Sequence, residues 1–444
     1  MFMSHGALAQ QLSALNSQAL IYRDYSQPQG NVNSLHINSF PKWATIDMQI
    51  RERGESQSSE KYVSGYDAIY DLSRVWGGLE LRPSKSIVMY AQFIDSHALG
   101  LPLAYVAANQ RNSFDLRQGY LAYHARNLTI IAGRQELRYG NERILGISNW
   151  TNTSRTWDGF LGRIGDKNRL DLFSTSAVVV HPTSLDTHGA GLNFHGAVGT
   201  ITTWVPRMVL QPFVYVKALP RVLSQQKKYG TETEVTPGVE ASGKLKNGFY
   251  FDLLGAMQRG SYSNDSIRAA AGYVKTGYFA EQMNWKPRLA GEYDYASGNP
   301  QTDLKRIGTF DFLYPGNHNA FGLVDLFGFE NIKQERVNLD LTPAKHMSVL
   351  IQHEWLQVAT VHDNVYSGSA SATVKAPTKG FLSDNIGRGI DASGQYAFLR
   401  NNGSVTLNAG VGHFSPGALM RENKHGAPLT MIYFGTTYRF KLNR

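Results

Sequence analysis

Apolar and polar side chains alternate through repeated segments of about 9–13 residues between Trp43 and Phe440, which is the pattern of transmembrane β-strands. In the segment 331–341, Arg336 lies on a mostly polar face, whereas Val337 and Leu339 lie on the opposite, apolar face. A soluble β-sandwich shows the same alternation, with its apolar face buried. The pattern therefore predicts strands without showing which face is turned inward.

About eighteen such segments follow one another along the chain, which suits a barrel because single-chain bacterial outer-membrane barrels have an even number of strands. The predicted strands are 43–51, 72–82, 86–96, 113–125, 128–138, 157–165, 168–180, 187–203, 209–219, 234–244, 248–259, 267–279, 286–297, 330–342, 346–359, 386–399, 403–413 and 429–441.

The links between these segments alternate in length. Every second link is a tight turn: 83–85, 126–127, 166–167, 206–207, 246–247, 343–345 and 401–402. The links that alternate with these tight turns are mostly long: 52–71, 97–112, 139–156, 220–233, 298–329, 360–385 and 414–428. The links 181–186 and 260–266 are short for outer loops, and 280–285 is long for a turn. This sorting predicts an all-β protein, a closed antiparallel transmembrane β-barrel with short periplasmic turns and long extracellular loops.

The last predicted strand carries Tyr433, Gly435, Tyr438 and Phe440, a spacing that resembles the signal read by the barrel-assembly machinery. The chain continues past the final aromatic residue through 441–444, and an ordinary amphipathic edge strand would show a similar pattern. Pairing of this strand with the first one would remove both unpaired sheet edges. We therefore expect closure of the barrel at its two ends, and the assembly machinery as a partner during biogenesis.

The N-terminus predicts a leader. Ala7-Leu8-Ala9 reads as a signal-peptidase site, although the charged and apolar regions that precede such a site are missing. The alternative is an alanine-rich N-terminus without this role. We predict a signal-peptide remnant at 1–9, a periplasmic tail at 10–42 and the barrel at 43–444. The predicted location is the bacterial outer membrane, in contact with its lipid.

Composition narrows the function. The mean hydropathy is −0.31, and no stretch approaches the roughly 18 apolar residues of a membrane-spanning helix. There is no cysteine, so a disulfide framework, a cysteine-based zinc site and a thiol nucleophile are excluded. The formal net charge is +9, but the basic residues are scattered singly rather than clustered. This distribution favours a pore that attracts anions over a nucleic-acid-binding surface, and we predict no nucleic-acid partner.

One block of the sequence is distinctive, and it consists of Gly133-Arg134-Gln135, Tyr139-Gly140, Arg143, Trp150, Asn152, Arg155 and Trp157-Asp158-Gly159. This block resembles the alginate export family of outer-membrane porins. Trp157 stands where the family more often has Phe. The resemblance implies an 18-stranded monomeric barrel whose arginine-rich lumen passes an anionic uronate polysaccharide. A family resemblance describes the fold better than the cargo.

Arginine suits such a cargo, because its planar guanidinium pairs with carboxylates through two hydrogen bonds and stays charged. Arg134, Glu136 and Arg138 are spaced by two, and would form a charged ladder with a repeat of about 7 Å on the lumen wall. A structural network within the lumen is the equal alternative. Strand parity adds further pore-lining candidates: Arg117, Arg288, Glu292, Asp294, Arg336 and Arg388, with Asp340 and Glu354 as further acidic partners.

The loop 139–156 holds the other candidates. Arg143 and Arg155 flank Trp150 in a segment that would fold into the lumen as a constriction, where aromatic rings suit sugars and guanidinium groups suit acids. Interfacial anchoring is the competing interpretation of the tryptophans, and we expect it for Trp157.

The enzyme alternatives are weak. No nucleophile elbow is present. His318, near Asp311 and Asp325, is interpreted as an ordinary polar loop residue rather than part of a metal or acid–base site. We therefore predict no enzyme activity, no cofactor and no metal. The predicted partner is an anionic polysaccharide or a small organic anion, the latter implying a general uptake porin. A barrel enzyme or an adhesin remains the alternative of another class.

Overall fold

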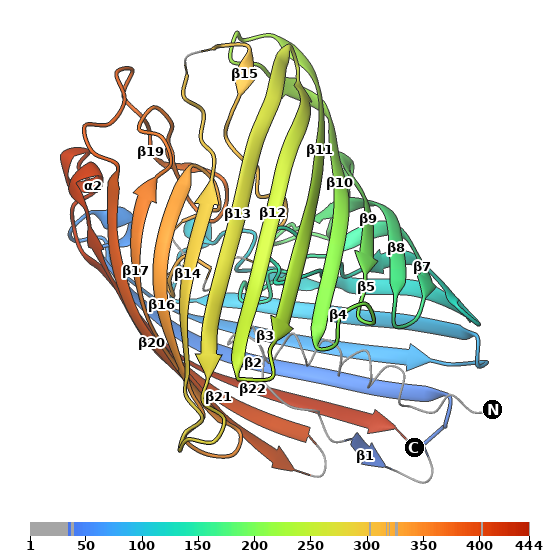
Figure 1. Ribbon diagram of the computed structural model, residues 1–444. Helices are drawn as coiled ribbons and strands as arrows, with labels where there is room; N and C mark the ends of the chain where they lie inside the picture. The colour runs from blue at the N-terminus through green and yellow to red at the C-terminus, as the bar shows by residue number, and fades with distance from the viewer. Residues whose placement is uncertain are drawn as a thin grey trace.

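The computed structural model of the 444-residue chain describes residues 34–36, 40–301, 303–316, 318, 320–324, 327–400 and 403–443. Eighteen long strands form the wall of a barrel (Figure 1). They are β2 (Ala44–Ser58), β3 (Ala68–Leu81), β4 (Ile87–Leu99), β5 (Asn112–Ala125), β6 (Leu128–Gln135), β7 (Trp157–Gly165), β8 (Arg169–Val179), β9 (Thr187–Thr200), β10 (Met208–Leu223), β11 (Tyr229–Lys244), β12 (Phe249–Tyr262), β13 (Asp265–Phe279), β14 (Arg288–Ala296), β16 (Ile332–Leu341), β17 (Met347–Val358), β20 (Asn385–Arg400), β21 (Gly403–Pro416) and β22 (Leu429–Asn443). All eighteen predicted strands are confirmed.

Short elements lie between the wall strands or beside them. They are β1 (Ser34–His36), β15 (Arg306–Ile307), β18 (Val365–Tyr366), β19 (Ala372–Val374), the helix α2 (Ala418–Glu422) and the 3-10 turns η1 (Glu60–Tyr62) and η2 (Leu103–Tyr105). Among the described residues, no helix has the length and apolar character needed to cross a membrane. The leader predicted at 1–9 and most of the tail predicted at 10–42 lie outside the described residues.

The barrel is closed by its two terminal strands. Each wall strand pairs antiparallel with its neighbours, and β2 pairs with both β3 and β22. Met48 faces Phe440 across this seam, so the last aromatic residue of the predicted assembly signal lies in the closing pair. Because every wall strand has two partners, the barrel has no open sheet edge, as expected for a structure in lipid.

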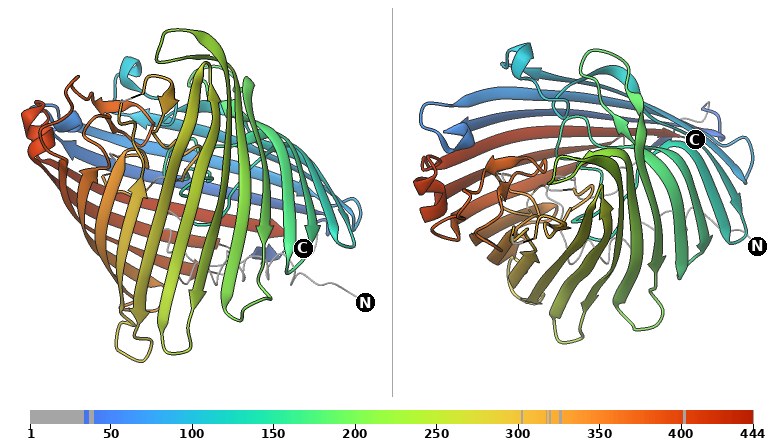
Figure 2. Two further views of the ribbon diagram at one scale, coloured as in Figure 1. Left: turned by 45° about the horizontal axis from the view of Figure 1, so that its top comes forward. Right: turned by 90° about the horizontal axis from the view of Figure 1, so that it is seen from above.

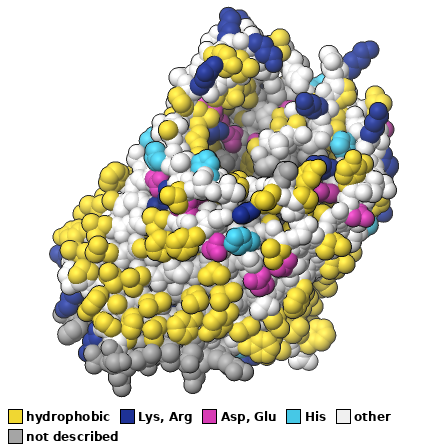
Figure 3. Space-filling view, turned by 180° about the vertical axis from the view of Figure 1, so that it is seen from behind, with side chains coloured by type: hydrophobic (Ala, Val, Ile, Leu, Met, Phe, Trp, Pro, Cys, Tyr) yellow, Lys and Arg dark blue, Asp and Glu magenta, His cyan; other side chains and the backbone are white. Residues whose placement is uncertain are grey.

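The structure also decides which face of each strand is turned inward. On β14, Arg288, Glu292 and Asp294 are buried, whereas Leu289 and Tyr293 are exposed on the outer wall. Figure 3 shows hydrophobic side chains over much of the outer surface, with charged side chains gathered around a hollow in the upper part of the view. The polar face therefore lines the lumen and the apolar face is available to lipid, which is the reverse of a soluble sandwich.

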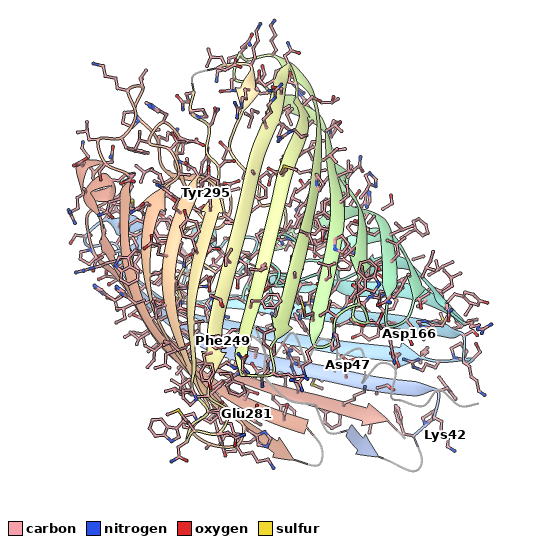
Figure 4. All side chains as sticks on the ribbon, viewed as in Figure 1. Lys42, Asp47, Asp166, Phe249, Glu281 and Tyr295 are labelled. Atoms are coloured by element: carbon pink, nitrogen blue, oxygen red, sulfur yellow. The ribbon has the colours of Figure 1, made fainter. Side chains whose placement is uncertain are left out.

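One end of the barrel has short turns and the other has long loops, as predicted. In Figure 4, Asp166 and Glu281 lie in turns at the lower end, whereas Tyr295 lies towards the loop end. The wall strands extend further towards the loops than expected. The predicted loop 260–266 is largely strand, because β12 and β13 stay paired up to Tyr262 and Asp265. Conversely, the strand predicted to reach 138 ends at Gln135.

Two of the long loops fold into the barrel, where Figure 2 shows them inside the ring of strands when seen from above. The first inward loop is 136–156 and the second is 297–331. They pair with each other, because the Gly146 amide donates to the Tyr314 carbonyl at 2.8 Å and the Tyr314 amide donates to the Ile144 carbonyl at 3.0 Å. Their apolar side chains, including Leu137 and Phe310, form the buried core inside the barrel.

Candidate functional site: the barrel lumen

A belt of alternating charge crosses the inner wall at one level. Asp252, Lys275, Glu292, Arg336 and Glu354 are successive cross-strand partners on β12, β13, β14, β16 and β17. Glu292 forms an ion pair with Arg336, and it lies 3.5 Å from the amino group of Lys275. Directly opposed charges of unlike sign stabilise neighbouring strands. The belt is a structural network within the lumen, formed by other residues than the ladder of 134, 136 and 138 for which such a network was the alternative.

The first inward loop joins this belt through Arg143. Its Nη2 lies 2.5 Å from Glu292 and its Nη1 lies 2.9 Å from Asp294, while its guanidinium is 4.2 Å from the ring centre of Tyr273. All four side chains are buried. Arg143, predicted to lie in a loop constriction, thus fastens the loop to the wall at β14.

The opposite wall carries arginines that the sequence analysis missed. Arg51, Arg53 and Arg74 point inward from β2 and β3. Arg51 donates to the Asn149 carbonyl at 2.8 Å, and Arg53 donates to the Trp150 carbonyl at 2.8 Å. The signal that could have revealed Arg51 and Arg53 is the spacing of two that relates positions 51, 53 and 55. The predicted strand ended at 51 because the loop-side half of β2 is polar on both faces.

Trp150 is held on the inner wall by three side chains. Arg53 lies 3.6 Å from the indole ring centre, the His318 ring stacks at 3.6 Å with an interplanar angle of 2°, and Tyr433 packs edge-on at 4.9 Å. Burial, followed by the charges of Arg53 and Arg51, lowers the pKa of His318 well below its ordinary value. His318 is therefore neutral near pH 7 and stacks as an uncharged ring.

The other expectations for this loop have mixed outcomes. Arg155 donates to the Gly146 carbonyl at 3.1 Å and to the Pro315 carbonyl at 3.0 Å, so it couples the two inward loops. Burial lowers the pKa of Arg155 to about 10, which still leaves it charged at neutral pH. The expectation that Trp157 anchors the protein at the membrane interface is wrong. This side chain is fully buried on the inward face of β7.

The turn-side half of the lumen contains a cavity of about 650 Å³ beneath the first inward loop. Arg117 crosses it, forming an ion pair with Glu136, donating to Gln92 at 2.5 Å and lying 3.7 Å from the ring centre of Trp76. Five cationic side chains line this cavity, against two acidic ones. They are Arg117, Arg138, Arg163, Arg439 and Lys441, against Asp47 and Glu136.

Two predicted lumen residues lie on the outer wall instead. Arg134 shares its face of β6 with the exposed Ile130, and forms a bidentate ion pair with Asp158 at 2.8 and 3.1 Å. The predicted ladder of 134, 136 and 138 is therefore wrong: Glu136 and Arg138 belong to the first inward loop, not to the strand. Arg388 lies on the outward face of β20 with Ile390, which is 54% exposed.

The remaining predicted candidates share the inward face. Arg288 lies near the turn end of β14, directly opposite Asp340, with its guanidinium 4.5 Å from the ring centre of Phe279. Arg138 forms an ion pair of 2.8 Å with Glu142 within the first inward loop. The inward-facing wall candidates are Arg117, Arg288, Glu292, Asp294 and Arg336.

One acidic group of the outer half has the composition of a metal site. Single carboxylate oxygens of Glu232, Glu234 and Asp311 lie within 4.8 Å of one another. The amino group of Lys217 already forms ion pairs with Asp311 and, at 3.3 Å, with Glu232, so a protein cation balances part of the charge. Asp311 thus lies with Lys217 rather than with His318. Asp325 is outside the described residues.

A closed 18-stranded barrel with an apolar outer wall, a charged lumen and loops folded into that lumen defines an outer-membrane porin. A family model described as alginate export matches residues 42–430, and the chain therefore belongs to the alginate export family. A search of curated proteins found no match.

Solved structures with a similar fold are outer-membrane channels of distant sequence. The outer membrane protein opdK from Pseudomonas aeruginosa has a TM-score of 0.60 at 10% identity, covering 91% of this chain and 100% of that one. OccD3 (OpdP) from the same organism has a TM-score of 0.60 at 11% identity and covers 94% of each chain. OccAB2 from Acinetobacter baumannii has a TM-score of 0.58 at 9% identity, covering 91% of this chain and 100% of that one. These likenesses concern the fold.

Proposed function

We propose that this porin passes an anionic substrate, and that a uronate polysaccharide is its cargo. The observation that carries the proposal is the cationic lining of the turn-side cavity. Its five basic side chains outnumber the acidic groups that share the cavity or pair with them, which are Asp47, Glu136, Glu142 and Asp171. A lumen with such an excess attracts anions and repels cations. Membership of the alginate export family supports the polysaccharide as cargo.

Passage through the barrel needs weak and repeated contacts. Below the first inward loop, Arg439 on β22 and Arg117 on β5 both line the cavity, with Gln49 on β2 and Trp76 on β3 between them around the wall. Above it, Arg51 and Arg53 already donate to loop carbonyl oxygens. The loop carbonyl oxygens accept hydrogen bonds from guanidinium groups that would also suit a carboxylate. Withdrawal of the loop would therefore make Arg51 and Arg53 available to the cargo. The loop then acts as a gate that competes with the substrate for the same arginines.

The test is ion selectivity in a planar bilayer. Purified, refolded protein is placed under a KCl gradient, and the reversal potential is measured with and without a hexuronate oligomer. We expect anion preference and block of the current by the oligomer. A preference for cations would contradict the proposal of an anionic cargo.

A small organic anion is the second candidate cargo. Two observations favour it: the two inward loops narrow the lumen, and one similar structure is opdK with vanillate, at 8% identity to this chain. Flux of a small carboxylate into protein-containing vesicles distinguishes the two. Fast flux without any block by the uronate oligomer would replace the polysaccharide proposal with small-anion uptake.

A further inference from the structure

The turn 280–287, between β13 and β14, is longer than the other described turns at its end of the barrel. It is held in shape by backbone hydrogen bonds, in which the Ala280 amide donates to the Pro287 carbonyl at 2.9 Å. The Thr342 amide donates to the Trp285 carbonyl at 2.6 Å, which ties the turn to the strand pair beyond it. Figure 4 labels Glu281 in this turn, below Phe249 at the start of β12. The turn is therefore an ordered element that extends beneath the wall.

A second cavity, of about 750 Å³, lies between this turn and the ends of β10, β11 and β13. Lys244 lies two residues after the inward-facing Ser242 at the turn end of β11, so it faces the lumen too. The cavity that it lines therefore opens at the turn-side mouth of the lumen. It is separate from the cavity under the first inward loop, with which it shares no residue.

The lining of this mouth cavity combines three kinds of chemistry. Arg207, Lys244 and Lys246 supply positive charge, against the single carboxylate of Glu281, which lies 2.9 Å from Lys244. Within the described part of the chain, neither Arg207 nor Lys246 forms an ion pair. The lining also includes the side-chain amides of Asn247 and Gln282 and the exposed side chain of Met283.

We infer that the mouth cavity is a binding site for a segment of an acidic saccharide, which rests on the proposed function. The two cations without ion pairs would each bind one carboxylate, and the side-chain amides would bind sugar hydroxyls as donors and acceptors. The exposed apolar side chain of Met283 suits the C–H face of a sugar ring. A ligand held here lies at the entrance on the turn side.

The cysteine-free sequence allows a local test, because a single engineered cysteine is the one site for a thiol-reactive dye. Gln282→Cys in the cavity lining is labelled with an environment-sensitive fluorophore, and the full-length protein in lipid nanodiscs is titrated with a hexuronate oligomer. A neutral oligosaccharide of equal length is the ligand control. The matched label is Lys167→Cys, in the turn between β7 and β8. We expect a saturable signal at 282 with the acidic oligomer alone, and none at 167.

Charge variants then assign the site. In the Gln282→Cys background, Arg207→Gln with Lys246→Gln should weaken binding at least about fivefold, as expected for loss of two exposed charge contacts. Arg126→Gln with Lys167→Gln removes two exposed cations from other turns and should leave binding unchanged. Equal affinity in both double variants, or equal binding of the neutral oligomer, would overturn the inference. The proposed function has its own test, because a cation preference of the unmodified pore in the planar bilayer would contradict it whether or not the mouth cavity binds the oligomer.

Discussion

The guanidinium of Arg53 lies 3.6 Å from the centre of the Trp150 indole ring and donates a hydrogen bond of 2.8 Å to the Trp150 carbonyl oxygen. Arg53 belongs to the wall and Trp150 to the first inward loop, so this pair fastens the loop inside the lumen. Both side chains are buried. A desolvated cation–π contact contributes about 2 kcal/mol, and a hydrogen bond from a charged donor contributes about 1.5–3 kcal/mol.

Removing this contact should open the pore. Arg53→Gln loses the cation over the indole ring, so we expect a larger single-channel conductance and longer open times in planar bilayers. Because Arg53 also pairs with Glu55 at 2.6 Å, the double variant Arg53→Gln, Glu55→Gln keeps the charge balanced and should open the pore as well. Arg82→Gln, whose side chain is 44% exposed at the turn end, is the control. Unchanged conductance in both Arg53 variants would contradict the gate.

The Glu292 carboxylate should stabilise the barrel more than other carboxylates of β14 and β16. It lies between Arg143, Arg336 and Lys275, so Glu292→Gln leaves three buried cations with one fewer partner. Breaking a buried ion pair from one side costs about 3–5 kcal/mol. We expect the urea midpoint of unfolding to fall, measured by the electrophoretic shift between folded and unfolded barrel. Glu335→Gln on the outward face of β16 is the control, and an equal fall there would refute the role of the belt.

Arg117 and Arg134 should differ in their effect on selectivity, although sequence reasoning proposed both for the lumen. Arg117→Gln removes a cation from the turn-side cavity, and should lower the ratio of anion to cation permeability roughly twofold, because the local field weakens. Arg134 pairs with Asp158 on the outer wall, so Arg134→Gln should leave the reversal potential unchanged. A shift of equal size in both variants would place Arg134 in the conducting path.

Acidification should loosen the gate through His318. Its pKa is lowered in the buried stack with Trp150, so a displaced loop takes up a proton more readily than the folded one. Neutral His318 stabilises the folded loop fully above the ordinary pKa of histidine, about 6.5, and this contribution is lost as the pH falls below that value. We therefore expect open probability to rise between pH 7.5 and pH 5, and His318→Gln to remove this dependence. A rise that persists in His318→Gln would assign it to other groups.

Glu330 should act in the opposite direction. Burial and then the neighbouring Asp311 and Asp363 raise the pKa of Glu330 well above its ordinary value. A group with a raised pKa stabilises the folded loop below the ordinary value of about 4.3, and this contribution is lost as the pH rises towards the raised one. Glu330→Gln should therefore reduce open probability at pH 8 relative to the unmodified protein. An increase at pH 8 would show that the ionised carboxylate stabilises the closed loop.

Particular residues show which inward and outward faces could be predicted from the sequence and which could not. The alternation around Arg336 and Val337 was sufficient to assign their faces once the sorting of turns and loops indicated a barrel. At Arg388 parity failed, because the inward positions beside it are Gly387 and Gly389, which have no side chain to show the lumen face. At Arg134 the assumed strand was too long, since the chain leaves the wall after Gln135 and enters the lumen.

The sequence by itself determined the eighteen strands and the barrel class, because these depend on local periodicity and on the lengths of connections, and the motif block around Gly133 to Gly159 indicated the family by resemblance. Only the tertiary structure decided that the loops 136–156 and 297–331 meet inside the barrel and pair with each other. Such contacts join residues as distant as Arg143 and Glu292, whose separation of 149 positions leaves no periodic signal. The roles of the arginines therefore follow from long-range packing, which turns several expected cargo contacts into contacts that hold the loops inside the lumen.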